Sequence, residues 1–273
     1  MALSIDYSWN VFRFLGDFLH AGSVFAVLLT LINNKNARGL SFKTQFFYLL
    51  IFITRYLDMF SLSHSAHSSY LFFFKLFYII SSASIVLVMR KWEATIETNK
   101  DTCSYFFVLT PCFFAALVSL LGSNTQRTFQ LFFWTFSEFL EALAMLPQYI
   151  FTYRQDAEHK RSDSGIFLFI SLVGMYRVLY ACNWIYKKVM LGTAYTDPVS
   201  WIGGFIEIAL FFDFILNREF LRHIVLALDS RVGQFSNQIE LNVFARDTAS
   251  ELPGIRNRKL AATLDSDEAM LMI

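Results

Sequence analysis

Long apolar stretches alternate with short polar segments over most of the chain. A helix needs about 20 mainly apolar residues to cross the hydrocarbon core of a bilayer. Residues 103–126 contain no charged residue and are the clearest example. Six further stretches keep the length but carry some charge, at residues 11–32, 42–60, 68–89, 129–151, 165–185 and 198–217. The pattern predicts an all-α polytopic membrane protein with seven transmembrane helices.

Composition favours lipid over water as the main solvent of the chain. Hydrophobic residues make up 55% of it, 32 residues are phenylalanine, and only 16% are charged, where soluble domains have about a quarter. The net charge of +1 argues against a nucleic-acid partner. The three cysteines, Cys103, Cys112 and Cys182, are scattered, so we expect neither a disulfide framework nor a metal site or other cofactor.

Lysine and arginine are distributed unequally between the predicted loops. The loops on one side hold only Arg127, Lys187 and Lys188, whereas those on the other side, and the polar tail, hold many more. An excess of basic residues marks the cytosolic side of a membrane protein. We therefore predict three regions: a lumenal N-terminus at 1–10, a transmembrane domain at 11–217 and a cytosolic tail at 218–273.

Charged side chains occur inside several predicted spans, where each costs roughly 2.5–3.5 kcal/mol near the membrane centre. Arg13, Asp17 and His20 are spaced four and three residues apart, which places them on one face of a helix. Further stripes of this kind contain Arg55 with Tyr56 and Asp58, then Trp134 with Glu138 and Glu141, and finally Arg177, Tyr180, Trp184 and Lys187.

The last of these stripes favours a binding site over a purely structural role. Two cations, Arg177 and Lys187, share its face with aromatic side chains and with no acidic residue of the same helix. Cations and aromatic rings around a cavity suit a small anionic ligand held by guanidinium contacts. The alternative is that the charged residues are ion pairs that hold helices together. We find no HExxH, GxSxG or Walker motif, so we expect a binding protein and not an enzyme.

Four segments carry a resemblance to a known family: NVFRFLGDFLH (10–20), TRYLDMF (54–60), LFFWTFSEFLEALAMLPQ (131–148) and MYRVLYACNWIY (175–186). They resemble the KDEL receptors, which retain proteins of the endoplasmic reticulum (ER) lumen. The resemblance implies seven helices in a SWEET-like pair of three-helix bundles, joined by the fourth span. It also implies a PQ-loop-type element at Pro147–Gln148, a lumenal N-terminus and a cytosolic C-terminus.

The resemblance further implies roles for individual residues. Arg55, with Tyr56, would hold the C-terminal carboxylate of an escaped ER protein. Arg13 and the sixth-span cation would bind the acidic side chains of its terminal tetrapeptide. The cavity would be lined by Trp134, Tyr176, Arg177, Tyr180 and Trp184, with Asn183 in support.

Three other residues correspond to regulatory positions of the family. His20 matches a histidine whose protonation favours ligand binding in the acidic Golgi, and Glu141 matches a carboxylate linked to this pH switch. Asp213 matches a residue needed for receptor recycling. The resemblance thus implies binding that depends on pH.

The chain departs from the family pattern at three places. Lys187 stands where the family has an arginine, and Leu131 stands where it has an acidic residue that contacts the lysine at the first ligand position. We therefore expect a tetrapeptide with an apolar first residue to bind at least as well as one with lysine. The long tail also lacks the short lysine-rich end of typical members, which bears on the coat-binding signal.

The resemblance implies a Golgi-to-ER retrieval receptor in the ER and cis-Golgi membranes. Its partners would be soluble ER proteins with KDEL-like C-termini, bound at acidic pH and released at neutral pH, and the coatomer machinery of retrograde vesicles. One alternative is a SWEET or PQ-loop transporter of a small solute, which needs a cavity that opens to both sides. Another is a divergent family member that has lost ligand binding.

Overall fold

The computed structural model describes residues 10–57, 66–122, 129–157, 163–192 and 197–217, with residues 223, 227, 230, 231 and 234. The chain divides into two compact units, Met1–Ala227 and Leu228–Ile273. Within the described residues all regular secondary structure is helical. Most of the predicted tail, and Asp58, lie outside these residues.

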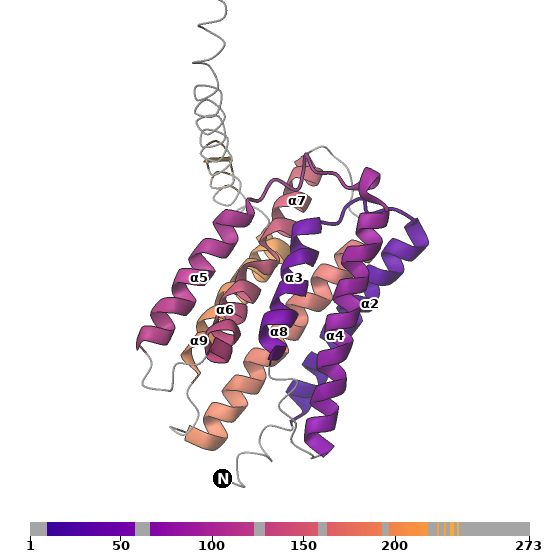
Figure 1. Ribbon diagram of the computed structural model, residues 1–273. Helices are drawn as coiled ribbons and strands as arrows, with labels where there is room; N and C mark the ends of the chain where they lie inside the picture. The colour runs from indigo at the N-terminus through magenta and orange to yellow at the C-terminus, as the bar shows by residue number, and fades with distance from the viewer. Residues whose placement is uncertain are drawn as a thin grey trace, which may run out of the picture. The chain divides into compact units, whose positions relative to one another are not determined.

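The described helices that cross or flank the predicted membrane region belong to the first unit (Figure 1). A one-turn 3-10 helix, η2, follows α4, and a π-helical turn, η4, ends α9. The elements are α2 (Val11–Asn34), α3 (Phe42–Arg55), α4 (Ala66–Lys91), η2 (Glu93–Thr95), α5 (Tyr105–Gly122), α6 (Phe129–Ala144), α7 (Leu146–Ala157), α8 (Ser164–Leu191), α9 (Pro198–Phe212) and η4 (Asp213–Asn217).

Six helical segments are long and apolar enough to cross a membrane, so the chain is a polytopic membrane protein. The helix α3 is not among them, because it has 14 residues and ends at Arg55. The rest of the predicted span at 42–60 lies, from residue 58 onward, outside the described part of the chain. The six segments are Val11–Asn34, Tyr70–Lys91, Tyr105–Gly122, Phe129–Asp156, Ser164–Leu191 and Pro198–Leu216.

Polar side chains begin the helices where the apolar stretches start. Asn10 accepts a hydrogen bond from the backbone N–H of Arg13 at the start of α2. In the same way Ser41 caps α3, Asp163 caps α8 and Asp197 caps α9. Such caps satisfy backbone N–H groups that have no partner inside the helix.

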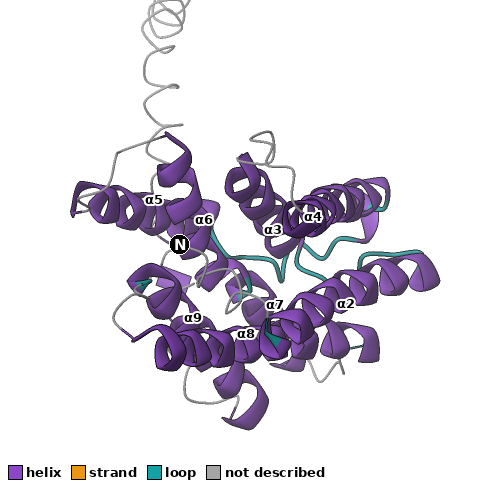
Figure 2. Ribbon diagram, turned by 90° about the horizontal axis from the view of Figure 1, so that it is seen from below, coloured by secondary structure: helices purple, strands orange, loops and turns teal. Residues whose placement is uncertain are grey.

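Six helices form a ring of neighbours (Figure 2). In this ring α2 contacts α4, α4 contacts α3, α3 contacts α6, α6 contacts α9, α9 contacts α8, and α8 returns to α2. The helix α5 packs on the outside of α6. Gly16 allows α2 and α8 to approach closely, because a Cβ atom there would lie 2.7 Å from the ring of Tyr180.

The predicted span at 129–151 is divided into α6 and α7 at Met145, just before Pro147–Gln148. The side chain of Gln148 is fully buried. Its Oε1 accepts a hydrogen bond from the N–H of Ser41 at 2.9 Å, and its Nε2 donates to the carbonyl oxygen of Gly39 at 3.0 Å. These two hydrogen bonds of Gln148 therefore connect the loop between α2 and α3 to α7.

The same loop is fastened to the segment between α4 and α5. Asp101 accepts hydrogen bonds from the hydroxyl of Ser41 at 2.8 Å and from the N–H of Lys43 at 3.1 Å. Glu97 accepts one from the N–H of Gly39 at 3.1 Å. We call these residues, Gly39, Ser41, Lys43, Glu97, Asp101 and Gln148, the loop-end network. Most of its bonds join a side chain to a backbone group, which closes this end of the helix ring.

Candidate functional site

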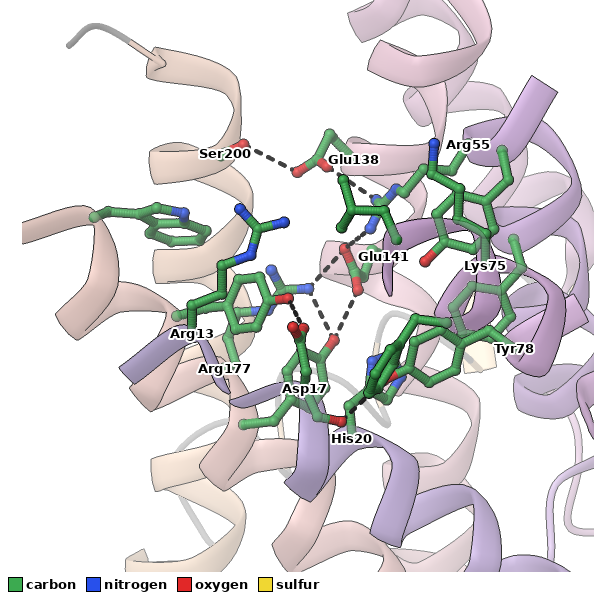
Figure 3. A pocket seen from close by; sticks show the side chains of 17 residues that line it. Arg13, Asp17, His20, Arg55, Lys75, Tyr78, Glu138, Glu141, Arg177 and Ser200 are labelled. Carbon is green, nitrogen blue, oxygen red and sulfur yellow. Dashed lines mark hydrogen bonds and ion pairs between the residues drawn. The ribbon is translucent and has the colours of Figure 1, made fainter. Parts of the chain in front are cut away.

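A cavity of about 260 Å³ lies within the helix ring, at the opposite end from the loop-end network. It lies near the start of α2, α4 and α9, the end of α3, and the second halves of α6 and α8. All six ring helices contribute to its wall, which is rich in charged and aromatic side chains (Figure 3). The wall consists of Arg13, Asp17, His20, Phe52, Arg55, Tyr56, Leu71, Phe74, Lys75, Tyr78, Glu138, Glu141, Tyr176, Arg177, Tyr180, Trp184 and Ser200.

Two arginines and three glutamates form a chain of ion pairs across this region. Arg55 Nη2 lies 3.1 Å from Glu138, and Arg55 Nη1 lies 2.7 Å from Glu141. Arg177 Nη2 lies 2.8 Å from Glu141, and Arg177 Nε lies 2.5 Å from Glu207. The stripe of Arg177, which has no acid on its own helix, thus receives acids from α6 and α9. Structural ion pairs between helices are therefore present at this site.

Glu141 is the centre of the network and is 3% exposed. One of its oxygens accepts a hydrogen bond from the hydroxyl of Tyr176 at 2.7 Å, and the other contacts both arginines. Arg177 also donates to the hydroxyl of Tyr176 at 3.0 Å. If Glu141 moved away, the buried cations of Arg55 and Arg177 would lose a counter-ion, which is costly in free energy.

His20 packs between aromatic rings at the inner wall of the cavity. Its imidazole stacks on the ring of Tyr176, with 4.2 Å between ring centroids and 5° between planes. The ring of Tyr78 lies 4.7 Å away. Tyr176 therefore touches both His20 and Glu141, so a charge on His20 would reach the ion-pair network through one shared neighbour.

Asp17 is held by hydroxyl groups from two other helices. Tyr180 of α8 donates a hydrogen bond to its Oδ1, and Tyr70 of α4 donates to its Oδ2 at 3.1 Å. Arg13 precedes Asp17 by about one turn on the same face of α2 and also lines the cavity. Within the described residues, no group of three or more His, Cys, Asp or Glu side chains could hold a metal ion.

Comparison with known proteins gives this arrangement a family context. Residues 36–187 match the family model for the ER lumen protein retaining receptor. The chain belongs to the ER lumen protein retaining receptor family. It is 36% identical to the ER lumen protein-retaining receptor of Petunia hybrida over 213 residues, a match that covers 75% of this chain and 91% of the relative.

Relatives from distant organisms give similar values. The ER lumen protein-retaining receptor of Entamoeba histolytica is 32% identical over 207 residues, which is 76% of this chain and 91% of the relative. That of Drosophila melanogaster is 34% identical over 205 residues, or 75% and 91%. The family consists of receptors and not of enzymes. With its candidate membrane spans, this chain is a multipass membrane protein of the secretory pathway.

Some residues predicted from the resemblance lie away from the cavity wall of this family member. Asn183 accepts a hydrogen bond from Asn10 at 2.6 Å, which ties α8 to the cap of α2. Asp213 accepts a hydrogen bond from Tyr153 of α7 at 3.5 Å, near the closed end of the ring. The predicted site residues outside the wall are Leu131, Trp134, Asn183, Lys187 and Asp213.

Other wall residues had no predicted role in the receptor site. Asp17 and Glu138 could be found from the sequence, because each lies four residues after a predicted site residue, Arg13 or Trp134, on the same helix face. Ser200 gives no such signal, because its contact with Glu138 depends on the packing of α9 against α6. Glu207, which lies outside the wall, stands out in the sequence as a charge within a predicted span, but its pairing with Arg177 depends on the packing of α9 against α8.

Proposed function

We propose that the chain is a Golgi-to-ER retrieval receptor for soluble ER proteins with KDEL-like C-termini. It binds their terminal tetrapeptide at acidic pH and releases it at neutral pH. Family membership supports the retention of ER proteins, and one observation carries the ligand assignment. Arg55 lines the cavity, and its Nη2 atom has no hydrogen bond of normal geometry within the described residues. It pairs with Glu138 at 3.1 Å by charge alone, so a ligand carboxylate could take the place of Glu138 there.

The proposed architecture has seven spans in the SWEET-like order. One group of three consists of α2, α3 and α4. The other consists of the α6–α7 segment, α8 and α9. The helix α5 links the two groups. The ring of contacts, with α5 outside it, supports this arrangement. With the N-terminus in the lumen, the cavity opens to the lumen and the loop-end network faces the cytosol, where the tail at 218–273 would meet coatomer. The receptor would cycle between the cis-Golgi and ER membranes.

The cavity offers a place for each part of an acidic tetrapeptide. Arg55 and Tyr56 bind the terminal carboxylate, and Arg13 and Arg177 attract the acidic side chains in the middle. A charge-assisted contact of this kind contributes about 1.5–3 kcal/mol. Lys187 adds a positive charge but without the fork geometry of arginine. Trp134 and Leu131, which lie on α6 outside the cavity wall, would contact the first ligand residue where it extends beyond the cavity.

Proton uptake at His20 explains why binding would depend on pH. A ligand that brings several carboxylates into the cavity is attracted by an additional positive charge. If binding and protonation of His20 are linked, each favours the other, so affinity is greatest at acidic pH and falls as pH rises.

A binding titration with purified protein tests these assignments. A Lys-Asp-Glu-Leu-ending peptide is titrated at pH 5.5 and 7.4 against wild type, Arg55→Ala and His20→Ala. We expect tighter binding at pH 5.5, about tenfold weaker binding for Arg55→Ala, and a similar loss for the amidated peptide. In His20→Ala the difference between the two pH values should shrink. Equal affinity for the amidated and free peptides would exclude the carboxylate assignment.

The first ligand position is tested by competition at pH 5.5 between peptides led by lysine, methionine or phenylalanine. Burial of each methylene group against Leu131 and Trp134 contributes about 0.8 kcal/mol. We expect the apolar-led peptides to compete at least as well as the lysine-led one. A tenfold advantage for lysine would show that Leu131 does not form this subsite.

A further inference from the structure

The ion-pair network has one part that the cavity can reach. The side chains of Arg55 and Glu138 are 15% and 12% exposed, whereas those of Arg177 and Glu141 are 5% and 3% exposed. A ligand that enters the cavity therefore meets the contact between Arg55 and Glu138 before it meets the rest of the network.

The three nitrogen atoms of Arg55 are not equally occupied. Its Nε donates to the hydroxyl of Ser137 at 3.1 Å, and its Nη1 donates to Glu141 at 2.7 Å. Its Nη2 lies 3.1 Å from Glu138, but this contact has no hydrogen-bond alignment. Glu138 thus pairs with Arg55 by charge, through the nitrogen atom that we assign to the ligand carboxylate.

Glu138 is also held less firmly than Glu141. Its second oxygen accepts one hydrogen bond, from the hydroxyl of Ser200 at 3.2 Å. Glu141 instead contacts two guanidinium groups and the hydroxyl of Tyr176. Of the two carboxylates on Arg55, Glu138 is the one that can move aside at a lower free-energy cost.

We propose that Glu138 is a built-in competitor, a carboxylate tethered to α6 that occupies the place of the ligand carboxylate on Arg55. This inference rests on the proposed function, and it adds a second acid-sensitive group to the site. At neutral pH the charged Glu138 must be displaced, and it repels the incoming carboxylate. Proton uptake by Glu138 removes both obstacles, because a neutral carboxyl group pairs only weakly with a guanidinium group.

The charged and titratable groups around Glu138 are consistent with this role. The cations of Arg55 from α3 and Arg177 from α8 attract the charged form of Glu138. A second carboxylate brought near them competes with Glu138 for the same two cations. Glu141 on α6, Asp197 at the cap of α9 and the ligand itself all supply negative charge nearby. The helix α5, which packs on α6, has no acidic or basic residue in Tyr105–Gly122.

The decisive experiment is a peptide titration of Glu138→Gln and Glu138→Ala at pH 5.5 and 7.4. In Glu138→Gln the new amide oxygen could still contact Arg55. Glu138→Ala has no such oxygen, so the two variants together separate loss of charge from loss of contact. We expect both variants to bind the free-carboxylate peptide about tenfold more tightly than wild type at pH 7.4. At pH 5.5 the difference should be small. For the amidated peptide we expect no gain at either pH, since it has no carboxylate to compete.

The matched control is Glu93→Gln, which also removes one negative charge but from an exposed pair with Arg90. It should bind as wild type does. Unchanged affinity in both Glu138 variants at pH 7.4 would overturn the competitor role while leaving the receptor function in place. Weaker binding of lysine-led peptides would also overturn it, because Glu138 would then be an anchor for that lysine. If no variant and no wild-type sample binds any peptide at pH 5.5, the proposed function and this inference fail together.

Discussion

The two ends of the helix ring are both polar, but their polar groups have different partners. At the cavity end, charged side chains pair with other side chains, as in Arg55 with Glu138 and Arg177 with Glu207. At the closed end, side chains bond to backbone groups, as Gln148 does to Ser41 and Gly39. The first kind of contact can exchange one carboxylate for another. The contacts between side chains and backbone satisfy buried backbone groups that have no other hydrogen-bond partner.

This difference indicates which end of the ring can exchange ligand. A guanidinium group accepts a carboxylate of the protein or of a peptide with similar geometry. A buried backbone N–H that loses its side-chain acceptor is left unpaired, and opening the closed end would break several such bonds together. The comparison favours a cavity that opens on one side, as a receptor requires, over alternating access. The predictions below test the two ends separately.

The largest effect is expected at the cavity end, for Arg177→Met. Removal of this cation leaves Glu207 without its ion-pair partner, while Glu141 keeps Arg55 and Tyr176. Breaking a buried pair from one side costs about 3–5 kcal/mol of stability. Thermal unfolding of the purified protein in detergent measures the loss.

The double variant Arg177→Met/Glu207→Met should recover much of this loss, because it leaves no unpaired buried charge. As a control, Arg90→Met removes a cation from an exposed pair with Glu93, and such pairs contribute about 0–1 kcal/mol. Equal stability of the Arg177 and Arg90 variants would show that the pairs at the cavity end do not hold the helices together.

At the closed end, Asp101→Ala should destabilise the protein without changing peptide affinity. The substitution leaves the hydroxyl of Ser41 and the N–H of Lys43 without their acceptor. Each buried donor that loses its partner costs about 1–3 kcal/mol. Thermal unfolding and a peptide titration are measured on the same sample. A loss of affinity at unchanged stability would contradict the separation of the two ends.

The sequence predicted the cavity end in outline and the pairing within it only in part. Spacing placed Arg13, Asp17 and His20 on one face of α2, and all three line the cavity. Spacing within one helix says nothing about its neighbours. The stripe of Arg177 has no acidic residue of its own helix, and its sequence does not show that Glu141 and Glu207 approach it from α6 and α9.

The closed end was less accessible to sequence reasoning. Pro147–Gln148 was recognised as an element of the family, but its position does not reveal that Gln148 bonds to the loop between α2 and α3. Asp101 and Ser41 are 60 residues apart, and polar residues near loops ordinarily face water. Their burial follows from how the loops fold over the helix ends, which no local pattern encodes.

A smaller effect is expected from Gly204→Ala, which tests how closely the helices must approach around the cavity. A Cβ atom at Gly204 would overlap the ring of Trp184, which lines the cavity. Such overpacking costs typically about 1–3 kcal/mol. The expected result is lower thermal stability together with weaker peptide binding, as the indole shifts. Gly22→Ala is the matched control, since its Cβ would meet only Leu172 at an ordinary 3.7 Å. That variant should be as stable as wild type or slightly more stable.

The smallest effect concerns Asp163, which caps α8 far from the cavity. Its carboxylate accepts hydrogen bonds from the N–H of Gly165 at 3.0 Å and from Asn34 of α2 at 2.6 Å. Loss of such a cap in Asp163→Ala should cost about 0.5–2 kcal/mol.

The bond from Gly165 holds the pKa of Asp163 below its ordinary value of 3.8, because it favours the charged form. The contribution of the charge is therefore complete above pH 3.8 and is lost as pH falls through the lower folded-state value. Asp163→Asn keeps a good cap without the charge, so its stability at neutral pH should lie near that of wild type. Thermal unfolding across acidic pH should then show a smaller decline for Asp163→Asn than for wild type, and equal declines would show that the charge of Asp163 contributes nothing.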